Sequence, residues 1–266
     1  MSHPEGEIVI ERRDHLFLIG VNRPAKLNGY TPKMTRELAA AYTAFEDDAA
    51  LRCAILHAIG EHFTAGLDLP SMAPLLKRGE SSMPLEYIDP FDLRADRLGR
   101  RRTKPLIAAV RGITYTIGIE LMLAADIVIA ATDCRFSQLE VKRGIMATGG
   151  ATIRIAERAG LGNALLHLLT GDEFGADDAL RMGLVQKVVK PGEELALALD
   201  VAARIAQQAP LAVVATRENA LLGVREGPAA AYAQFSAIQA RLANSDDAAE
   251  GVRSFVEKRA ARFTGS

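Results

Sequence analysis

The sequence predicts an α/β protein built around a mostly parallel sheet, and three observations support that prediction. Short apolar runs alternate with stretches that have apolar residues at helical spacing, which is typical of parallel strands joined by right-handed crossovers. The last third of the chain shows almost no strand pattern. The chain has 266 residues, of which 49% are hydrophobic and 24% are charged, and this ordinary composition excludes disordered, collagen-like and disulfide-scaffold proteins.

The first 60 residues predict a hairpin, a helix and a buried strand, in that order. Residues 8–12 are a short β-branched run, and residues 16–21 form a second strand-like run after a turn, which is typical of a hairpin. Thr31 followed by Pro32 predicts a helix start, because Thr is a good N-cap and Pro suits the first helical position. Residues 53–59 form an apolar run that a glycine ends, and this predicts a buried strand.

The middle of the chain repeats this pattern. Residues 106–110 and 126–130 predict two further strands, and residues 118–125 between them predict a helix. A helix is also expected over residues 150–160. Residues 85–102 have an acidic start and a basic end, which favours a helix because such charges complement the helix dipole.

The last third predicts successive helices separated by proline, glycine and asparagine. The expected helices cover residues 193–207, 211–222, 229–243 and 246–262. We therefore expect an α/β core over residues 1–205, which holds the substrate site, and a C-terminal helical region over residues 206–266. The apolar faces of these helices exceed what a small core needs, so they must pack on the core or on another subunit.

Charge and residue counts exclude several functions. The formal net charge is -1, so no overall basic field attracts nucleic acid or an anionic membrane. Cys53 and Cys134 are interpreted as small buried or half-buried residues, and neither they nor the five histidines have metal-site spacing. Residues 1–7 lack the apolar segment of a secretory signal, and no apolar run is long enough to span a membrane. We expect a cytoplasmic protein.

Three segments hold residues that suit chemistry, and the first is residues 60–69. This segment follows a buried strand, and Gly66 within it allows a sharp turn. Such a turn leaves the Leu67 amide without a ladder partner, which makes it a candidate oxyanion donor. An ordinary surface turn explains the same residues, because glycine is common in turns.

The second and third segments each place a glutamate in an unusual setting. A helix begins near Ile117, and its first free amides stabilise negative charge. Glu120 lies in the first turn of that helix, where it either takes part in chemistry or simply complements the dipole. Glu140 stands between apolar neighbours, which would raise its pKa toward neutrality. The alternative for Glu140 is a solvated side chain on an edge or loop.

These three segments, in this order, resemble the crotonase superfamily, which is the enoyl-CoA hydratase/isomerase family. The resemblance runs over nearly the whole chain. It rests on Asn22-Arg23-Pro24 with Asn28, on residues 63–69, 104–112, 120–121, 125–127, 169–171 and 183–185, and on residues 255–259 with Phe263. Thr116, Ile117 and Leu139 depart from the residues that the family usually has at those positions.

The resemblance implies a fold and a chemistry. The implied fold is a crotonase-like spiral of ββα units with a C-terminal helical oligomerisation layer, and the implied substrate is an acyl-CoA thioester. The backbone amides of Leu67 and Ile117 match the family's oxyanion hole. Glu120 and Glu140 match the catalytic carboxylates that hold one water in family hydratases. The positions matched to substrate binding are Ala65, Gly66, Asp68, Leu69, Gly118 and Lys258.

The presence of both glutamates favours an enoyl-CoA hydratase, because family isomerases often keep only the second. The alternatives are an enoyl-CoA isomerase or another acyl-CoA lyase of this family and, in a different class, a non-catalytic acyl-CoA- or RNA-binding protein. A binding protein needs no carboxylate pair. We expect no metal and no cofactor beyond the CoA of the substrate.

The resemblance also implies a homotrimer or hexamer, in which residues after about 205 make much of the contact and Lys258 approaches CoA phosphate. A basic run at residues 100–104 is either a solvated helix end or a contact with CoA phosphates or a partner. Asp68 and Asp126 are interpreted first as capping or turn residues.

Overall fold

The computed structural model describes residues 4–93 and 100–266. Its main sheet has six strands in the order β1-β2-β3-β4-β6-β9. β1 pairs antiparallel with β2, and the other neighbouring strands of this sheet are parallel. The strands are β1 (Glu7–Arg13), β2 (Leu16–Asn22), β3 (Cys53–Ala58), β4 (Leu106–Val110), β6 (Ile127–Ala131) and β9 (Lys187–Val189). The predicted hairpin and the predicted parallel sheet are confirmed.

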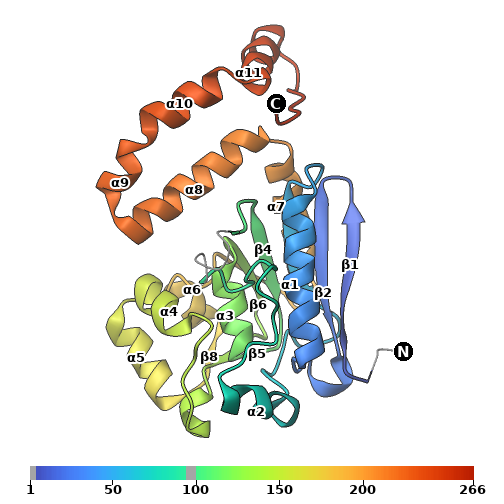
Figure 1. Ribbon diagram of the computed structural model, residues 1–266, viewed down its shortest axis with the longest axis vertical. Helices are drawn as coiled ribbons and strands as arrows, with labels where there is room; N and C mark the ends of the chain where they lie inside the picture. The colour runs from blue at the N-terminus through green and yellow to red at the C-terminus, as the bar shows by residue number, and fades with distance from the viewer. Residues whose placement is uncertain (1–3, 94–99) are drawn as a thin grey trace.

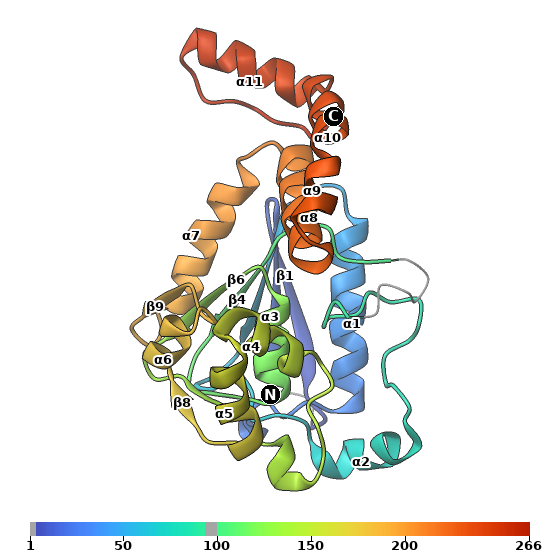
Figure 2. The ribbon, with the colours of Figure 1, turned by 90° about the vertical axis from the view of Figure 1, so that its left-hand side faces the viewer.

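A smaller sheet and several helices complete the body of the molecule (Figure 1, Figure 2). The smaller sheet contains β5 (Ile113–Tyr115), β7 (Arg135–Ser137) and β8 (Phe174–Gly175). The helices of the body include α1 (Pro32–Asp47), α2 (Leu69–Arg78), α3 (Ile117–Ala124), α4 (Ala151–Ala159), α5 (Leu161–Thr170) and α6 (Ala176–Arg181). Thr31 caps α1 as expected, since its hydroxyl accepts a hydrogen bond from the amide of Met34.

The central strands β2, β3, β4 and β6 of the main sheet are buried on both faces, which explains their apolar runs. Along β2, Phe17 and Ile19 belong to the core on the side of α1 and α3, whereas Leu16 and Leu18 belong to the core on the other side. That other side is covered by the alanine-rich helix α7 (Glu194–Ala206). Because both faces are covered, functional side chains have to stand on the loops and helix ends at the edge of the sheet.

The helix expected over residues 85–102 is wrong for the part of that range that the structure describes. Residues 85–93 form turns and irregular chain. Pro90 cannot donate a helical hydrogen bond, and the Asp89 carboxylate accepts hydrogen bonds from two of the amides that follow it. Residues 94–99 lie outside the described residues.

The helices after α7 form an arm that stands away from the body (Figure 1, Figure 2). They are α8 (Pro210–Glu226), α9 (Pro228–Ala233), α10 (Phe235–Ala243) and α11 (Asp246–Glu257). The single helix expected over residues 229–243 is therefore two helices, and the last helix ends before residue 262. The arm begins near residue 207, and its treatment as a separate region from residue 206 stays a prediction.

Within the described residues, no single helix is long and apolar enough to cross a membrane. The pair α7 and α8 reaches the required length and composition only together, across a bend of 109°. One face of α7 packs against the main sheet.

A buried ion cluster ties α8 to the body. Asp126, just before β6, pairs with Arg102 at 2.7 Å and with Arg217 of α8 at 2.8 Å. Arg102 is buried and also donates to the carbonyl of Ala124 at the end of α3. Burial alone would raise the pKa of Asp126, but the two guanidinium groups hold it below its ordinary value. The base of the arm is thus anchored by one carboxylate that serves two arginines.

We expect Asp126→Ala to lower the free energy of unfolding by about 3–5 kcal/mol, because it leaves the buried Arg102 and the half-buried Arg217 without their carboxylate. Urea denaturation followed by circular dichroism measures the loss. The matched control is Asp178→Ala, which removes an exposed ion pair with Arg181 and should cost less than about 1 kcal/mol. Equal losses in the two variants would show that the cluster does not anchor the arm.

Candidate active site

The loop that follows β3 is fixed by hydrogen bonds from an earlier turn of the chain. The side-chain amide of Asn28 donates to two carbonyl oxygens of the loop, at 3.0 and 2.7 Å. The Thr64 hydroxyl donates in turn to the carbonyl of Asn28 at 2.7 Å. Tyr30 pairs with the loop as a strand would, through the carbonyl of Gly66 and the amide of Asp68. These bonds hold the loop in one conformation.

The loop contacts the turn before α3 at points that require glycine. Gly66 has φ = +119°, and a Cβ there would lie 2.5 Å from the hydroxyl oxygen of Thr116. A Cβ on Gly118 would lie 2.7 Å from a methyl carbon of Thr64. The two segments that were predicted to form an oxyanion hole therefore pack against each other.

The amides of Leu67 and Ile117 are available as donors. The strand-like bonds around Leu67 use Gly66 and Asp68, so the Leu67 N–H points away from that pairing. Ile117 is the first residue of α3, where amides have no partner within the helix. In the part of the chain that the structure describes, neither N–H finds an acceptor. Thr116, just before α3, has φ = +49° and ψ = −114°, a strained conformation for a residue with a Cβ.

Glu120 lies in the first turn of α3 and is 6% exposed. Its Oε1 accepts hydrogen bonds from the amides of Gly149 at 2.5 Å and Ala151 at 3.5 Å. Burial is the main reason that its pKa rises to about 7, and the charge of Glu140 raises it further, whereas the two amides and Arg154 act in the opposite direction. Glu120 is therefore suited to give and take a proton near neutral pH.

The buried carboxylate also explains the glycine just before α4. A Cβ on Gly149 would lie 2.5 Å from Oε2 of Glu120 and 2.9 Å from the ring of Phe91. Because Gly149 has no side chain, its backbone lies close enough to Glu120 for the Gly149 amide to donate to the carboxylate.

Glu140 begins the short 3₁₀ helix η2 (Glu140–Arg143) and is half-buried. Burial raises the pKa of Glu140 as well. With its amide nitrogen turned toward this carboxylate, the buried Gln138 donates to both oxygens, at 3.0 and 3.2 Å. Because Glu140 shifts the pKa of Glu120, the two carboxylates interact electrostatically. Interacting carboxylates with raised pKa values are typical of a site that moves protons.

A family model described as enoyl-CoA hydratase/isomerase matches residues 11–266. The chain belongs to this family. The enoyl-CoA hydratase EchA19 of Mycobacterium tuberculosis is 36% identical over 97% of this chain and 96% of its own length. A crotonyl-CoA hydratase of Syntrophomonas wolfei is 34% identical over 96% of this chain and 97% of its own.

The solved structures of family members agree with the fold. The crystal structure of a probable enoyl-CoA hydratase/isomerase from Mycobacterium abscessus has a TM-score of 0.92 and 46% identity, and the match covers 97% of this chain and 98% of that one. An enoyl-CoA hydratase from Mycobacterium tuberculosis has a TM-score of 0.86 and 37% identity, with 99% and 100% covered. The predicted family and its α/β fold with a C-terminal helical region are confirmed.

Several residues that match the family's substrate positions have structural partners in this chain. The Ala65 amide donates to a carbonyl of the preceding turn at 2.9 Å. Asp68 caps α2 and pairs with Arg23 at 2.6 Å, in agreement with the capping role expected for it. Leu69 begins α2. Contact of these residues with a substrate stays a prediction.

Lys258 does not lie with the other predicted site residues. It follows the last turn of α11 at the far end of the arm, whereas α3 lies within the body (Figure 1). Any role for Lys258 at the family's CoA site would therefore require a neighbouring subunit.

Sequence reasoning missed Gln138 and the amide of Gly149 as partners of the two glutamates. Nothing in the sequence marks Gln138, because its burial and its contact with Glu140 follow from the fold. Among the described residues, no group of three or more His, Cys, Asp or Glu side chains could hold a metal ion. The expectation of no metal and no separate cofactor stays a prediction.

We expect Glu120→Gln to raise the free energy of unfolding at pH 8 and to change it little at pH 5. The pKa of Glu120 is about 7 in the folded protein against an ordinary 4.5, so the folded state binds the proton more tightly and the carboxylate costs stability as pH rises through this window. The gain at pH 8 is up to about 3 kcal/mol, which is the free energy equivalent of that pKa difference.

Urea denaturation at the two pH values measures this effect. The control is Glu86→Gln, because Glu86 is exposed and its substitution should change stability by less than about 0.5 kcal/mol. A gain of equal size at both pH values would mean that the buried charge of Glu120 is not its cause.

Proposed function

We propose that this protein is an enoyl-CoA hydratase, which adds water across the 2,3 double bond of an enoyl-CoA thioester. The observation that carries the proposal is the pair formed by Glu120 and Glu140, two interacting carboxylates with raised pKa values beside a helix N-terminus. Relatives that are named enoyl-CoA and crotonyl-CoA hydratases support it.

In the proposed mechanism, the amides of Leu67 and Ile117 hold the thioester oxygen as it becomes negatively charged. The contact between Gly66 and Thr116 supports this role, because it brings the two donor segments together. The positive end of α3 adds to the stabilisation. The negative charge that develops on addition of water is therefore spread over an enolate whose oxygen has backbone donors.

The two carboxylates divide the proton transfers. Glu120 and Glu140 hold one water between them, and the water oxygen bonds to C3 while one carboxylate accepts its proton. The other glutamate, in its protonated form, gives a proton to C2. The sum of these steps is the addition of one water, and both glutamates are regenerated once they exchange the proton with solvent.

Two other functions are compatible with this fold, and the experiment below distinguishes them from hydration. An isomerase would move a proton from C2 to C4 and needs one carboxylate, so the presence of two interacting carboxylates favours hydration. A non-catalytic acyl-CoA- or RNA-binding protein has no use for the pair, whose burial costs stability. The predicted location is the cytoplasm, and the predicted cofactor is none beyond the CoA of the substrate.

We expect Glu140→Gln to lower the turnover of crotonyl-CoA by about 10²-fold or more, because an amide cannot take part in general acid–base catalysis. Loss of the absorbance of the conjugated thioester measures hydration. The exposed Glu86→Gln variant serves as the control and should keep wild-type turnover. Hydration at the wild-type rate by Glu140→Gln would remove Glu140 from the mechanism, and a wild-type protein that only gains this absorbance with a 3-enoyl-CoA would be an isomerase.

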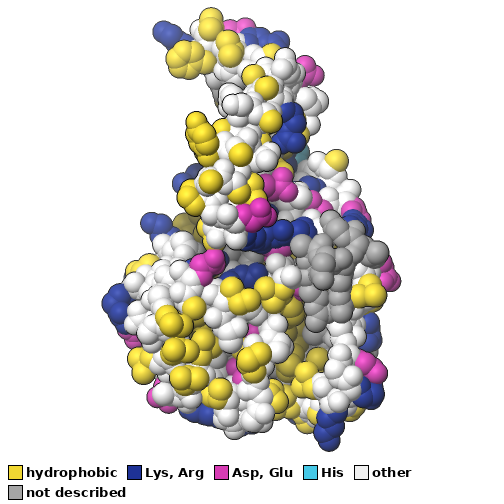
Figure 3. All heavy atoms as spheres, turned by 60° about the vertical axis from the view of Figure 1, so that its left-hand side comes forward, with side chains coloured by type: hydrophobic (Ala, Val, Ile, Leu, Met, Phe, Trp, Pro, Cys, Tyr) yellow, Lys and Arg dark blue, Asp and Glu magenta, His cyan; other side chains and the backbone are white. Residues whose placement is uncertain are grey.

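We also propose that the protein assembles as a homotrimer or hexamer. Large apolar side chains are exposed on the arm, including Tyr232 (73%) and Phe255 (84%). Apolar side chains also gather on the body below the arm (Figure 3). On α4 and α5 the exposed apolar side chains are those of Ile153, Leu161, Leu165, Leu166 and Leu169. Exposed apolar patches commonly mark contact surfaces, so the contact would include α4 and α5 besides the residues after 205.

We expect sedimentation velocity at micromolar concentration to show a trimer or hexamer, and a stable monomer would contradict the proposal. Within such an assembly, Lys258→Ala should raise the Kd for acyl-CoA roughly 2- to 10-fold at low salt, the usual worth of one polar contact. The rise should shrink at high salt. Lys187→Ala, an exposed lysine on β9, is the matched control. An unchanged Kd in Lys258→Ala would exclude a phosphate contact and leave the assembly in place.

A further inference from the structure

A cavity of about 520 Å³ lies where the end of α3 meets α4 and α8. Its apolar lining comes from alanine, leucine, isoleucine and valine side chains of these helices, and its polar lining contains five arginines against three carboxylates. The arginines are Arg101, Arg154, Arg158, Arg217 and Arg225. Figure 3 shows basic side chains gathered in the hollow between the arm and the body. A space with apolar walls and a cationic end suits a hydrocarbon chain that ends in an anion.

Three of the five arginines already have carboxylate partners. Asp92 pairs with Arg101 at 3.1 Å and with Arg225 at 2.6 Å. Arg217 pairs with Asp126 at 2.8 Å. These pairs join α8 to the body and explain their arginines without any ligand.

Arg154 and Arg158 are different, because neither forms an ion pair within the described residues. They are half-buried, stand one turn apart on α4, and donate to main-chain carbonyls, those of Phe91 at 2.6 Å and Leu123 at 2.8 Å. The third acid of the lining, Glu157, is exposed and bonds to neither. Burial is the main reason that the pKa of both arginines is lowered, and the charge of Arg154 lowers that of Arg158 further. Nearby carboxylates act in the opposite direction without outweighing burial: Asp92, Asp89, Glu157 and Glu120 on Arg154, and Glu157 and Asp126 on Arg158. Two neighbouring cations in a partly dehydrated space are stabilised by an anion.

The cavity adjoins the candidate active site. Arg154 donates to the carbonyl of Gly149 at 3.4 Å, and the amide of the same glycine holds the Glu120 carboxylate. Along α3, Ile117 at the proposed oxyanion hole and Leu123 at the cavity are about 9 Å apart, from six residues at the helical rise. An extended acyl chain of roughly seven carbon–carbon bonds covers that distance.

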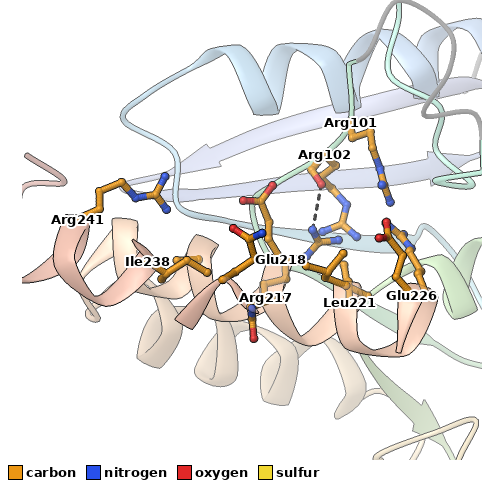
Figure 4. Close-up of a pocket in the computed structure, with 13 residues that line it drawn as sticks. Arg101, Arg102, Arg217, Glu218, Leu221, Glu226, Ile238 and Arg241 are labelled. Atoms are coloured by element: carbon orange, nitrogen blue, oxygen red, sulfur yellow. Dashed lines mark hydrogen bonds between the residues drawn. The ribbon is translucent and has the colours of Figure 1, made fainter. Parts of the chain in front are cut away.

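The basic lining continues beyond this cavity. Figure 4 shows Arg101, Arg102 and Arg217 around an adjoining cavity of about 370 Å³ between α8 and α10. There the guanidinium of Arg217 also donates to the carbonyl of Arg102 at 3.0 Å. The acids Glu218 and Glu226 line that second space. Among the described residues that line the first cavity, the arginines without an ion pair are those of α4.

We propose that Arg154 and Arg158 bind a carboxylate at the far end of the acyl group, so that the substrates are CoA thioesters of unsaturated dicarboxylic acids. The proposal rests on the proposed hydratase function for the orientation of the acyl chain. The carboxylate would give these two arginines the direct ion pair that neither forms among the described residues, and the apolar walls would contact the methylene groups. A plain alkyl chain would add no such ion pair.

The test compares the binding of two saturated, unreactive thioesters of equal chain length, suberyl-CoA and octanoyl-CoA, by isothermal titration calorimetry of the full chain. We expect suberyl-CoA to bind about 10- to 100-fold more tightly, as hydrogen bonds to a charged group would give. In Arg158→Gln this ratio should fall close to one. The matched control is Arg181→Gln, which removes an exposed arginine of α6 and should keep the ratio. If Arg158→Gln does not fold, Arg154→Gln gives the same readout.

A ratio near one in the wild-type protein would overturn the proposal, as would a ratio that both arginine variants leave unchanged. Inorganic phosphate at millimolar concentration is added in a further arm, and complete loss of the suberyl-CoA advantage in its presence would indicate a general anion site and overturn the assignment to the acyl end. Hydration of crotonyl-CoA is measured in parallel. A preference for suberyl-CoA without hydration of any enoyl-CoA would contradict the hydratase function and leave the carboxylate site standing.

Discussion

The hydrogen bond between the Gly149 amide and the carboxylate of Glu120 is the contact on which the candidate site depends. A carboxylate buried to this degree is expensive unless hydrogen-bond donors meet it, and here the donors are backbone amides at the start of α4. Those amides reach Glu120 only because residue 149 has no side chain. Burial raises the pKa of Glu120 by more than the two amide hydrogen bonds lower it, and the result is a pKa of about 7. The same balance that lowers stability thus produces a group able to exchange protons near neutral pH.

A second backbone approach places the proposed oxyanion donors. Gly66 lies against Thr116, and Gly118 lies against Thr64, so the two segments pack closely at two points. The side chain of Asn28, in the turn before α1, stabilises the loop after β3 by donating to two of its carbonyl oxygens. Donors that are fixed before the substrate arrives need no reorganisation when charge develops, and this is what makes backbone amides effective in such sites.

The sequence was informative where a residue's local surroundings decide its structure. Strands buried on both faces appear in the sequence as apolar runs, and Thr31 predicted the start of α1. The positions of Glu120 and Glu140 in a family pattern predicted a chemical role, which stays a prediction. The failures have local and distant causes. The charge pattern over residues 85–102 suggested a helix, but Pro90 and the turn-forming Asp89 prevail in the described part of it. Gln138 carries no signal, because its contact with Glu140 exists only after β7 and η2 are placed.

The arrangement of charge around α8 separates anchoring from recognition. Asp126 and Asp92 each pair with two arginines and join the body to the arm. These carboxylates have their counter-ions within the chain, so this group needs no ligand to balance its charge. Arg154 and Arg158 lie on the other wall of the same space and have only main-chain acceptors among the described residues. Cations that form no ion pair in a partly dehydrated space lower the stability of the folded state. If these side chains served only for packing, neutral residues of similar size would make the protein more stable. Their position near the candidate glutamate Glu120 is understandable if a further negative charge arrives with the substrate.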